Sequence, residues 1–511
     1  MVRRTGRLRA AVLLTALLAL AACSRPQTGA IRIGLASAAV SLDPRLATDA
    51  TSERLNRLLY RHLVDHDAAA RPVPALADWR RLGPRHYRFH LRGEGRLFHD
   101  GTRLTAADVV ATYRSVLDPA TASPHRGALA MIERVEAVDD DTVDFFIGRA
   151  DPLFPGYLGI GILPAAALAA GRDFARRPLG SGPFRLESWP DAGRLRLRRL
   201  RDGRLFVFER VADPTMRVLK LLHGEIDLLQ NDLPPELLHY LETRPGVKVA
   251  RRPGSNFAYL GFQLRDADTG KAEVRQAVAL AIDRRAIIDA LFDGGARPAA
   301  TLLPPEHWAG APALVAPERD LARARELLAG AGYSRERPLR LTYKTSADPF
   351  RVRIATVIQH QLGEAGIRVR VQSYDWGTFY GDIKNGRFQL FSLAWVGVRM
   401  PDIFRYAFHS ESVPPAGANR GRLADARVDA LIEAAEQAQD LDEKARLYRQ
   451  LQARLLELLP CVPLWYEDQF VAYRDSIQGY RLAADGNYDG LAAVRLRRGG
   501  VSAANSTPDG G

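Results

Sequence analysis

The sequence predicts an α/β protein with two or three domains, and three observations support this fold class. Segments that alternate apolar and polar residues, as strands do, are interspersed along the chain with segments of helical period. The 511 residues contain no internal repeat and no long low-complexity segment before the C-terminal tail. This length is sufficient for two or three domains with substantial hydrophobic cores.

The N-terminus has the pattern of an export signal. A basic start precedes the apolar run Ala10–Leu20, which is too short to span a bilayer but fits the core of a signal peptide. Leu20-Ala21-Ala22-Cys23 resembles a bacterial lipobox. We therefore expect cleavage after residue 22, a lipid on Cys23 that anchors the protein to a membrane of the cell envelope, and a tether over residues 23–30. The alternative is ordinary secretion with an unmodified Cys23.

Charge and cysteine content narrow the functional classes. The chain has 72 lysines and arginines against 59 aspartates and glutamates, a net charge of +13. The basic residues are interleaved with acidic ones, and the densest run, Arg194–Arg204, has the alternation of a half-buried strand with a charged outer face. We therefore expect no nucleic-acid partner. Cys461 lies in an apolar run and has no disulfide partner if Cys23 is lipidated.

The first predicted elements are short strands. Ile31–Leu35 is the opening strand, and Tyr87, Phe89 and Leu91 alternate with polar residues in a strand that has one buried face. Val135–Phe146 is typical of a hairpin, because an acidic turn separates two apolar segments.

The segment Phe98–Pro119 combines four local signals that agree with one another. Asp100-Gly101 predicts a tight turn. Thr105 and Asp108 have the spacing of a helix capping box, with Asp in place of the usual Glu or Gln. Three apolar residues recur at helical intervals and define one buried face: Val109, Tyr113 and Val116. Asp118-Pro119 ends the helix, because a residue before proline is driven out of the α region.

The second half of the chain is predicted to be richer in helices. Arg251–Gln263 is a strand that crosses into the helical block Glu273–Gly294, where Asp283 is the predicted N-cap of a second helix. The remaining predicted elements are helices at Pro317–Tyr333, Ile354–Val371 (leading into a strand) and Asp425–Leu458 (one long amphipathic helix), a strand at Trp465–Tyr473, and a disordered tail at 499–511.

These segments resemble those of the family 5 extracellular solute-binding proteins, the peptide-binding components of ABC importers. The pattern of Phe98–Pro119 matches the family signature, and Gly180–Phe184 (GSGPF) resembles a family loop. Ser41–Pro44 resembles a further family turn, and the helix pair Glu273–Gly294 a family segment. The resemblance extends from Ile31 to about Arg498 and implies a two-lobed, periplasmic-binding-protein-like α/β fold. It further implies mixed sheets flanked by helices and a hinge of two crossing segments.

The resemblance also implies the domain boundaries. Lobe I would comprise residues 31–253 plus 470–498, with an extra subdomain at about 58–170, and lobe II would comprise residues 254–469. Such proteins close around a ligand that is held between the lobes.

The sequence lacks the motifs of an enzyme. It has no GxSxG elbow, HExxH helix, phosphate-binding loop or dinucleotide fingerprint, so we predict no catalytic residues and no cofactor. His62 and His66 are spaced to share a metal ion, but no third ligand is placed nearby, and we predict no metal site.

Candidate ligand-binding residues follow from the resemblance. In peptide-binding members a loop with tryptophan and glycine usually carries an Asp that pairs with the peptide α-amino group. Here Trp395 and Gly397 match that loop, Val398 stands where the Asp is usual, and Asp402 is expected to be a cap or turn. The remaining candidates fall into four groups. They are the loop residues Val396 and Arg399; the crossing-strand residues Asn256, Phe257 and Tyr259; Lys344 and Thr345, near the position expected to bind the ligand carboxylate; and the aromatic and basic residues Tyr374, Trp376, Arg405 and Arg420.

The resulting functional hypothesis is a lipid-anchored, monomeric solute receptor that delivers a peptide-like ligand to an inner-membrane permease driven by an ATPase. Burying an ammonium without a counter-charge costs several kcal/mol. The presence of Val398 in place of Asp therefore implies one of two things. Either another acidic group pairs with the ligand α-amine, or the ligand lacks a free α-amine. The alternatives are a receptor for a nickel chelate, haem or a sugar-derived solute on the same fold, and, from another class, an envelope enzyme or chaperone.

Overall fold

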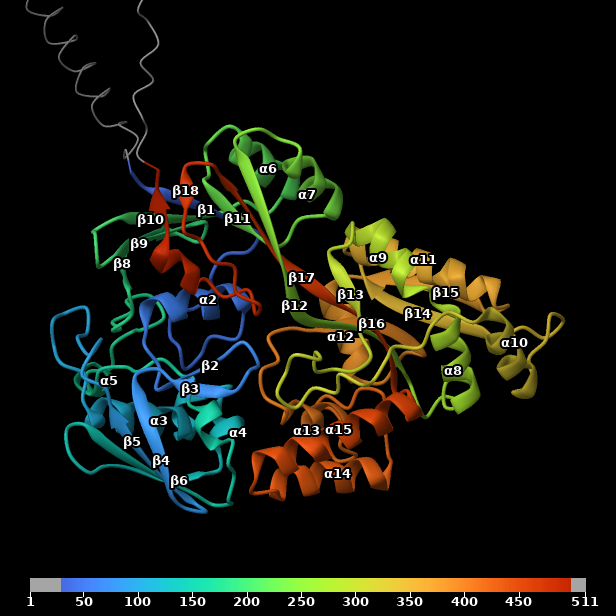
Figure 1. Ribbon diagram of the computed structural model, residues 1–511, viewed down its shortest axis with the longest axis horizontal. Helices are drawn as coiled ribbons and strands as arrows, with labels where there is room; N and C mark the ends of the chain where they lie inside the picture. Colours follow the sequence, from blue (N-terminus) through green and yellow to red (C-terminus); the bar gives the residue numbers. More distant parts are fainter. Residues whose placement is uncertain (1–28, 498–511) are drawn as a thin grey trace, which may run out of the picture.

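The computed structural model describes residues 29–497. The predicted signal peptide, Cys23, most of the tether and the tail 499–511 lie outside these residues. Within them, no helix is long and apolar enough to cross a membrane. Figure 1 shows two lobes side by side, joined by two long strands, β12 (Val247–Phe262) and β17 (Cys461–Arg474).

One mixed sheet of eleven strands runs through both lobes. Its strand order is β15-β14-β16-β12-β17-β11-β1-β10-β9-β8, and β13 pairs with β17. The strands other than β12 and β17 span β1 Ile31–Leu35, β8 Phe184–Asp191, β9 Arg194–Arg199, β10 Leu205–Arg210, β11 Leu228–Gln230, β13 Ala296–Pro298, β14 Arg340–Ser346, β15 Arg368–Tyr374 and β16 Leu390–Trp395. We call the part that contains β1 and β8–β11 lobe I, and the part that contains β13–β16 lobe II.

Lobe I carries a second, four-stranded antiparallel sheet of order β4-β5-β7-β6. Its strands and the nearby two-stranded pair span β4 Ala77–Gly83, β5 His86–Leu91, β6 Ile132–Ala137, β7 Thr142–Ile147, β2 Val64–His66 and β3 Pro72–Pro74. Helix α3 (Ala106–Leu117) packs on this sheet, and Tyr113 and Phe145 meet in the core with ring centroids 5.3 Å apart. This unit is the extra sheet seen at the lower left of Figure 1.

The other helical elements of lobe I flank the large sheet and its edge. They are α2 Ala50–Leu59, η1 Pro119–Thr121, α4 Arg126–Leu129, η2 Phe154–Tyr157, α5 Ala165–Ala169, α6 Pro214–Leu222, α7 Pro235–Glu242 and η3 Asp489–Ala493, with the short strands β18 Ile477–Gln478 and β19 Arg495–Leu496.

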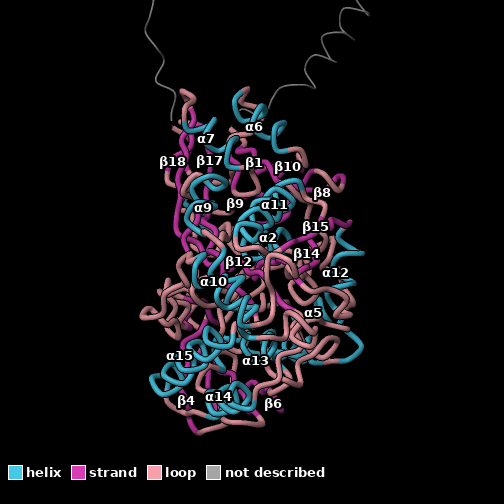
Figure 2. The backbone as a smooth tube through the Cα atoms, turned by 90° about the vertical axis from the view of Figure 1, so that its right-hand side faces the viewer, coloured by secondary structure: helices cyan, strands magenta, loops and turns pink. Residues whose placement is uncertain are grey.

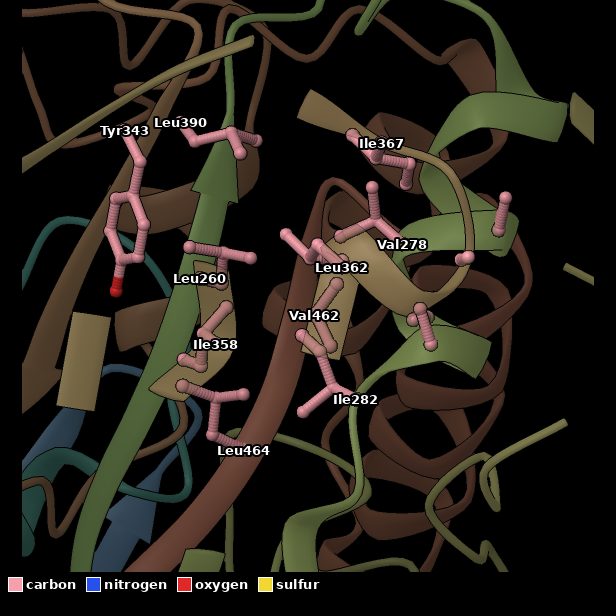
Figure 3. Packing of buried hydrophobic residues seen from close by; sticks show 14 of the residues in the cluster. Leu260, Val278, Ile282, Tyr343, Ile358, Leu362, Ile367, Leu390, Val462 and Leu464 are labelled. Atoms are coloured by element: carbon pink, nitrogen blue, oxygen red, sulfur yellow. The ribbon is translucent and has the colours of Figure 1, made fainter. Parts of the chain in front are cut away.

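Lobe II buries its sheet between two groups of helices. These helices are α8 Ala272–Ala281, α9 Arg284–Phe292, α10 Leu321–Gly330, α11 Pro349–Glu364, α12 Trp376–Lys384, α13 Ile403–Phe408, α14 Ala426–Gln437 and α15 Leu441–Leu458. On one face, Leu260, Val462 and Leu464 of the crossing strands pack against Ile358 and Leu362 of α11 (Figure 3). The opposite face, with Phe257 and Tyr259, is covered from α12 to α15.

The lobes also touch away from the crossing strands. Figures 1 and 2 both place α13–α15 beside the four-stranded sheet of lobe I. Arg149 of lobe I lies 3.3 Å from the Glu436 carboxylate, and the buried Lys444 ammonium lies 3.6 Å from Asp151. The two lobes are therefore connected both by the crossing strands and by this polar contact.

Most of the predicted elements are present. The opening strand, the strand at Tyr87, the hairpin and the capped helix after Thr105 are confirmed. Asp283 caps α9 by accepting from the Ala286 N–H at 2.9 Å, as predicted.

The single helix predicted for Asp425–Leu458 is wrong. The structure has two helices there, because the Asp440 side chain accepts hydrogen bonds from Asp442 and Glu443 N–H groups and thereby starts α15. A side-chain cap of this kind competes with continuation of the preceding helix.

Candidate ligand-binding site

The candidate site is built around a bulge in β12. Arg252 pairs with Gln469 and Asn256 pairs with Glu467, so three residues of β12 face a single residue of β17. Gly254 lies in this bulge, where a Cβ atom would come 2.2 Å from the Glu467 carbonyl oxygen, so only glycine fits. On one side of the bulge β17 also pairs with β11 of lobe I, and on the other with β13 of lobe II.

The loop after β16 reaches from lobe II to lobe I. Gly397 adopts a φ of +71°, which favours glycine and turns the chain. The Arg399 guanidinium forms an ion pair with Asp485 of lobe I, and its carbonyl oxygen lies 2.9 Å from His307 Nε2. Burial raises the pKa of Asp485, but the Arg399 charge, hydrogen bonds with Asn487 and the Arg57 charge together outweigh burial and hold that pKa below its usual value. The Asp485 carboxylate is therefore charged at neutral pH, and the pair links the two lobes.

Three predicted residues, Tyr259, Trp395 and Arg420, line a cavity in lobe II. It lies between the sheet, the end of α13 and the segment 418–421, and has a volume of about 30 Å³. Its walls are mainly apolar: Gly261, Phe262, Phe391, Ala407, Phe408, Ala418, Gly421, Pro460 and Cys461, with Asn419 and Arg420 as polar members. Phe257 lines an adjoining cavity of about 20 Å³, which shares Phe408, Pro460 and Cys461 with the first.

Arg420 supplies the positive charge of the first cavity. Its guanidinium donates to the Tyr259 hydroxyl at 2.8 Å and to the Tyr380 hydroxyl at 3.4 Å. It also lies 4.7 Å from the centroid of the Trp395 ring, a cation–π contact. Burial raises the pKa of Tyr259 to about 12, so this hydroxyl keeps its proton at neutral pH. The sequence named these residues separately, and the structure brings them together.

Other predicted residues lie apart from this cavity. Lys344 is already paired, with its ammonium 2.7 Å from the Asp382 carboxylate, and Thr345 is only 1% exposed on β14. Trp376 is 59% exposed on α12 and stacks on Tyr380, with ring centroids 5.4 Å apart. A solute could reach Thr345 only if β14 or its neighbours moved.

The remaining members of the predicted set occupy the loop and the bulge. Val396 and Gly397 are exposed, whereas Val398 is half-buried against the core beneath the loop. Asn256 is half-buried directly after the bulge. None of these four lines either cavity, so their role as ligand contacts stays a prediction.

Asp402, at the end of the loop, lies in an acidic environment between the lobes. It precedes α13, but its side chain makes no capping hydrogen bond. Burial, reinforced by the nearby Asp151 carboxylate, raises the pKa of Asp402 to about 6. The sequence predicted a cap or turn, and Asp402 does stand in a turn at the N-terminal end of α13, with its carbonyl oxygen 3.0 Å from the Arg405 nitrogen. Its carboxylate is also one whose charge is disfavoured at this contact.

The histidine pair does not assemble into a metal site in the described part of the chain. His62 lies 3.6 Å from Asp65, and Nε2 of His66 is buried without a hydrogen-bond partner. Burial, followed by the Arg399 charge, lowers the pKa of His66 to about 4. Among the described residues, the three side chains that could share an ion are His239, Glu242 and Asp293. They are exposed, and the Arg251 guanidinium already lies 2.9 Å from Glu242 and 3.1 Å from Asp293.

Comparison with known proteins gives relatives over nearly the whole chain. A dipeptide-binding protein of Pseudomonas aeruginosa is 27% identical, with 86% of this chain and 90% of that protein covered. Heme-binding protein A of Haemophilus influenzae is also 27% identical, with 90% and 91% covered. Each match therefore covers most of both chains.

Solved structures show the same fold. The substrate-binding protein CtaP of Listeria monocytogenes superimposes with a TM-score of 0.83 at 23% identity, covering 92% of this chain and 99% of that one. The oligopeptide-binding protein AppA of Bacillus subtilis, solved with a nonapeptide, gives 0.77 at 23% identity, with 92% and 99% covered. At this identity the likeness establishes the two-lobed fold alone.

The family model described as "Bacterial extracellular solute-binding proteins, family 5 Middle" matches residues 70–413. That match includes the four-stranded sheet of lobe I, the bulge in β12 and the loop at Trp395. Members of this family are solute-binding transport proteins and not enzymes. This chain therefore belongs to the family 5 bacterial extracellular solute-binding proteins.

Proposed function

We propose that this protein captures a peptide or peptide-like solute between its two lobes and delivers it to an inner-membrane ABC permease. The observation that carries the proposal is the pair of long strands β12 and β17, which run through both lobes and break register at the Gly254 bulge. Two bodies joined at such a break can rotate about it and enclose a ligand. The dipeptide-binding relative, matched over most of both chains, supports a peptide as the solute.

The proposed lobe boundaries follow the sequence. Lobe I comprises residues 31–253 and 470–498 with a subdomain at about 58–170, and lobe II comprises residues 254–469. The limit at 253/254 lies within the bulge, and the limit at 469/470 directly follows Gln469, which pairs with Arg252. Limited proteolysis tests them, because cleavage should begin in exposed connections rather than inside either lobe.

The ligand is tested most directly by identification of what the protein carries. The full-length protein, purified from its host without denaturation, should release peptides in native mass spectrometry. A mixed tripeptide library should raise its melting temperature and reduce its radius of gyration in solution scattering. Tight binding of haem with no response to the library would favour the second candidate, a haem receptor, which the Haemophilus relative supports. Nickel-chelate and sugar-derived solutes are tested in the same assay.

The anchor is proposed from the sequence alone. Cys23 carries the lipid, and the receptor acts as a monomer on the extracytoplasmic face of the membrane. Cys23→Ser should move the protein from the membrane fraction to the soluble fraction, whereas the control Cys461→Ser should leave it membrane-bound. Equal fractionation of both variants would contradict lipidation.

A further inference from the structure

We propose that Arg420 binds a carboxylate of the solute in the cavity beneath Trp395. The inference rests on the proposed peptide-binding function and adds to it a charged subsite. Four features carry it: the lack of an acidic partner for Arg420, the loop that holds it, the free hydroxyl protons beside it, and the size of the cavity.

Arg420 is half-buried, and its hydrogen-bond partners differ from those of the buried arginines of the described chain. Arg217, Arg275 and Arg284 donate to backbone carbonyl oxygens, and Arg199 pairs with Asp202 at 2.7 Å while also donating to carbonyls. The Arg420 side chain donates only to two phenol hydroxyls and lies within 4.0 Å of no carboxylate among residues 29–497. A charge in an apolar cavity that lacks a counter-charge is costly, and an anionic ligand would remove that cost.

The local chain is built to hold Arg420 at this place. The buried Asn419 amide donates to the His409 and Leu423 carbonyls at 3.1 and 2.8 Å and accepts from the Leu423 N–H at 2.8 Å. Gly421 lets the chain pass close to β12, since a Cβ atom there would lie 2.7 Å from the Phe262 carbonyl oxygen. These contacts fix the backbone on both sides of Arg420 against the strand that carries Tyr259.

The neighbouring hydroxyls complete an anion-binding arrangement. The Tyr259 and Tyr380 oxygens accept from the guanidinium, and neither hydroxyl donates to an acceptor among the described residues. Each therefore keeps a proton to donate. A carboxylate can accept from an arginine fork and from hydroxyl groups at once, and such charge-assisted hydrogen bonds are the strongest of their kind.

The dimensions of the cavity indicate a functional group and not a whole peptide. It has a volume of about 30 Å³, and the adjoining, largely apolar cavity has a volume of about 20 Å³. The first has room for about two water-sized groups, which is the size of a carboxylate, and the second for about one. The carboxylate has two possible sources, the peptide C-terminus or an acidic side chain, and the two sources predict different peptide preferences.

The test measures the affinity of four peptides by calorimetry: Ala-Ala-Ala, its C-terminal amide, Ala-Glu-Ala amide and Ala-Gln-Ala amide. The full-length protein is compared with Arg420→Gln, Arg420→Lys and the control Arg422→Gln. Arg422 lies two residues away, donates to the Lys384 carbonyl at 3.0 Å and does not line the cavity. The melting temperature of each variant without peptide shows whether it is folded.

We expect the wild type to bind one charged peptide about 10- to 100-fold more tightly than its neutral partner. This ratio corresponds to the usual free energy of a hydrogen bond to a charged group. A preference for Ala-Ala-Ala over its amide assigns the C-terminus, and a preference for Ala-Glu-Ala amide over Ala-Gln-Ala amide assigns a side chain. Arg420→Gln should abolish the preference without weakening the neutral peptides. Arg420→Lys should keep part of it, and Arg422→Gln all of it.

Three outcomes overturn the inference. Equal affinity of the wild type for charged and neutral peptides rejects the Arg420 subsite and leaves the peptide function intact. A preference that survives in folded Arg420→Gln does the same. Failure of the wild type to bind these peptides and a mixed tripeptide library contradicts the peptide function itself, and this inference with it.

Discussion

The segment Phe98–Pro119 and the loop Trp395–Asp402 are both recognisable in the sequence, yet they differ in what holds them. In the first, the Thr105 N–H donates to the Asp108 carboxylate at 2.7 Å, three residues away. In the second, Arg399 pairs with Asp485, which lies 86 residues further along the chain. The first segment is held by its own local contacts and by packing within lobe I, and the second by contacts between lobes.

This difference separates scaffold from site. Local contacts of a helix, its cap and its turn form whenever the sequence has the right spacing. Contacts between lobes exist only in one arrangement of the lobes, so they can change when a ligand binds. Substitutions in the first segment should therefore change stability alone, and substitutions in the loop should change stability, pH response and closure together.

The largest effect is expected for Tyr113→Ala in α3. Tyr113 is fully buried against Phe145, and loss of its ring should lower the free energy of unfolding by about 3–5 kcal/mol. Tyr113→Phe is the matched control, because the Tyr113 hydroxyl is buried without a hydrogen-bond partner and its removal should be neutral or stabilising. Urea unfolding measures both. A larger loss for the Phe variant than for the Ala variant would contradict the packing argument.

Asp108→Ala should follow, at about 2–4 kcal/mol. Besides the Thr105 N–H, the Asp108 carboxylate accepts from the Ala165 N–H at 2.7 Å, and its loss leaves two backbone donors without this acceptor. The exposed Asp100→Ala, in the same segment, should cost less than about 1 kcal/mol. Peptide affinity of the folded Asp108 variant should equal that of the wild type. A changed affinity would place this segment in the binding machinery.

Asp402→Asn should stabilise the protein at high pH by about 3 kcal/mol, since the pKa of Asp402 is raised from 3.8 to about 6. The raised pKa of Asp402 means that the folded state favours the protonated acid, so the wild type loses stability as pH rises from about 4 through about 6. Asparagine resembles the neutral acid. The gain should be present at pH 8, absent near pH 3.5, and visible as a higher melting temperature.

The matched control for Asp402 is Asp375→Asn. Asp375 is exposed, and hydrogen bonds from Thr378 lower its pKa, so the sign of its contribution is opposite. No gain at pH 8 is expected for this variant. A pH-independent gain for Asp402→Asn would show that packing, and not charge, causes the effect.

The smallest effect is expected for the Arg399–Asp485 pair. Its side chains are 30% and 22% exposed, so a double-mutant cycle of Arg399→Gln and Asp485→Asn should give a coupling of at most about 1 kcal/mol. The single variants should nevertheless enlarge the radius of gyration of the ligand-free protein if the pair holds the lobes together. Additive effects in the cycle would contradict a direct interaction.

Sequence patterns predicted the elements better than the site. The strand at Phe89 and the cap at Asp283 are encoded by residues within four positions of one another, and both were predictable. The sequence does not predict the break between α14 and α15, because the pattern around Asp440 is compatible both with an exposed position inside a helix and with a helix N-cap. Arg420, Tyr259 and Trp395 were each named from sequence, but nothing in the sequence indicates that a guanidinium 161 residues from Tyr259 donates to its hydroxyl.

By itself the sequence determined the α/β class, the family-like order of elements and the locally capped helix of the signature segment, because these depend on periodicity and on short-range hydrogen bonds. Only the tertiary structure decided which charges are already paired. It neutralised Lys344 with Asp382 and Arg399 with Asp485, and it left Arg420 facing phenol hydroxyls. The physical reason is that the energy of a buried charge depends on what surrounds it in space, whatever the distance along the chain.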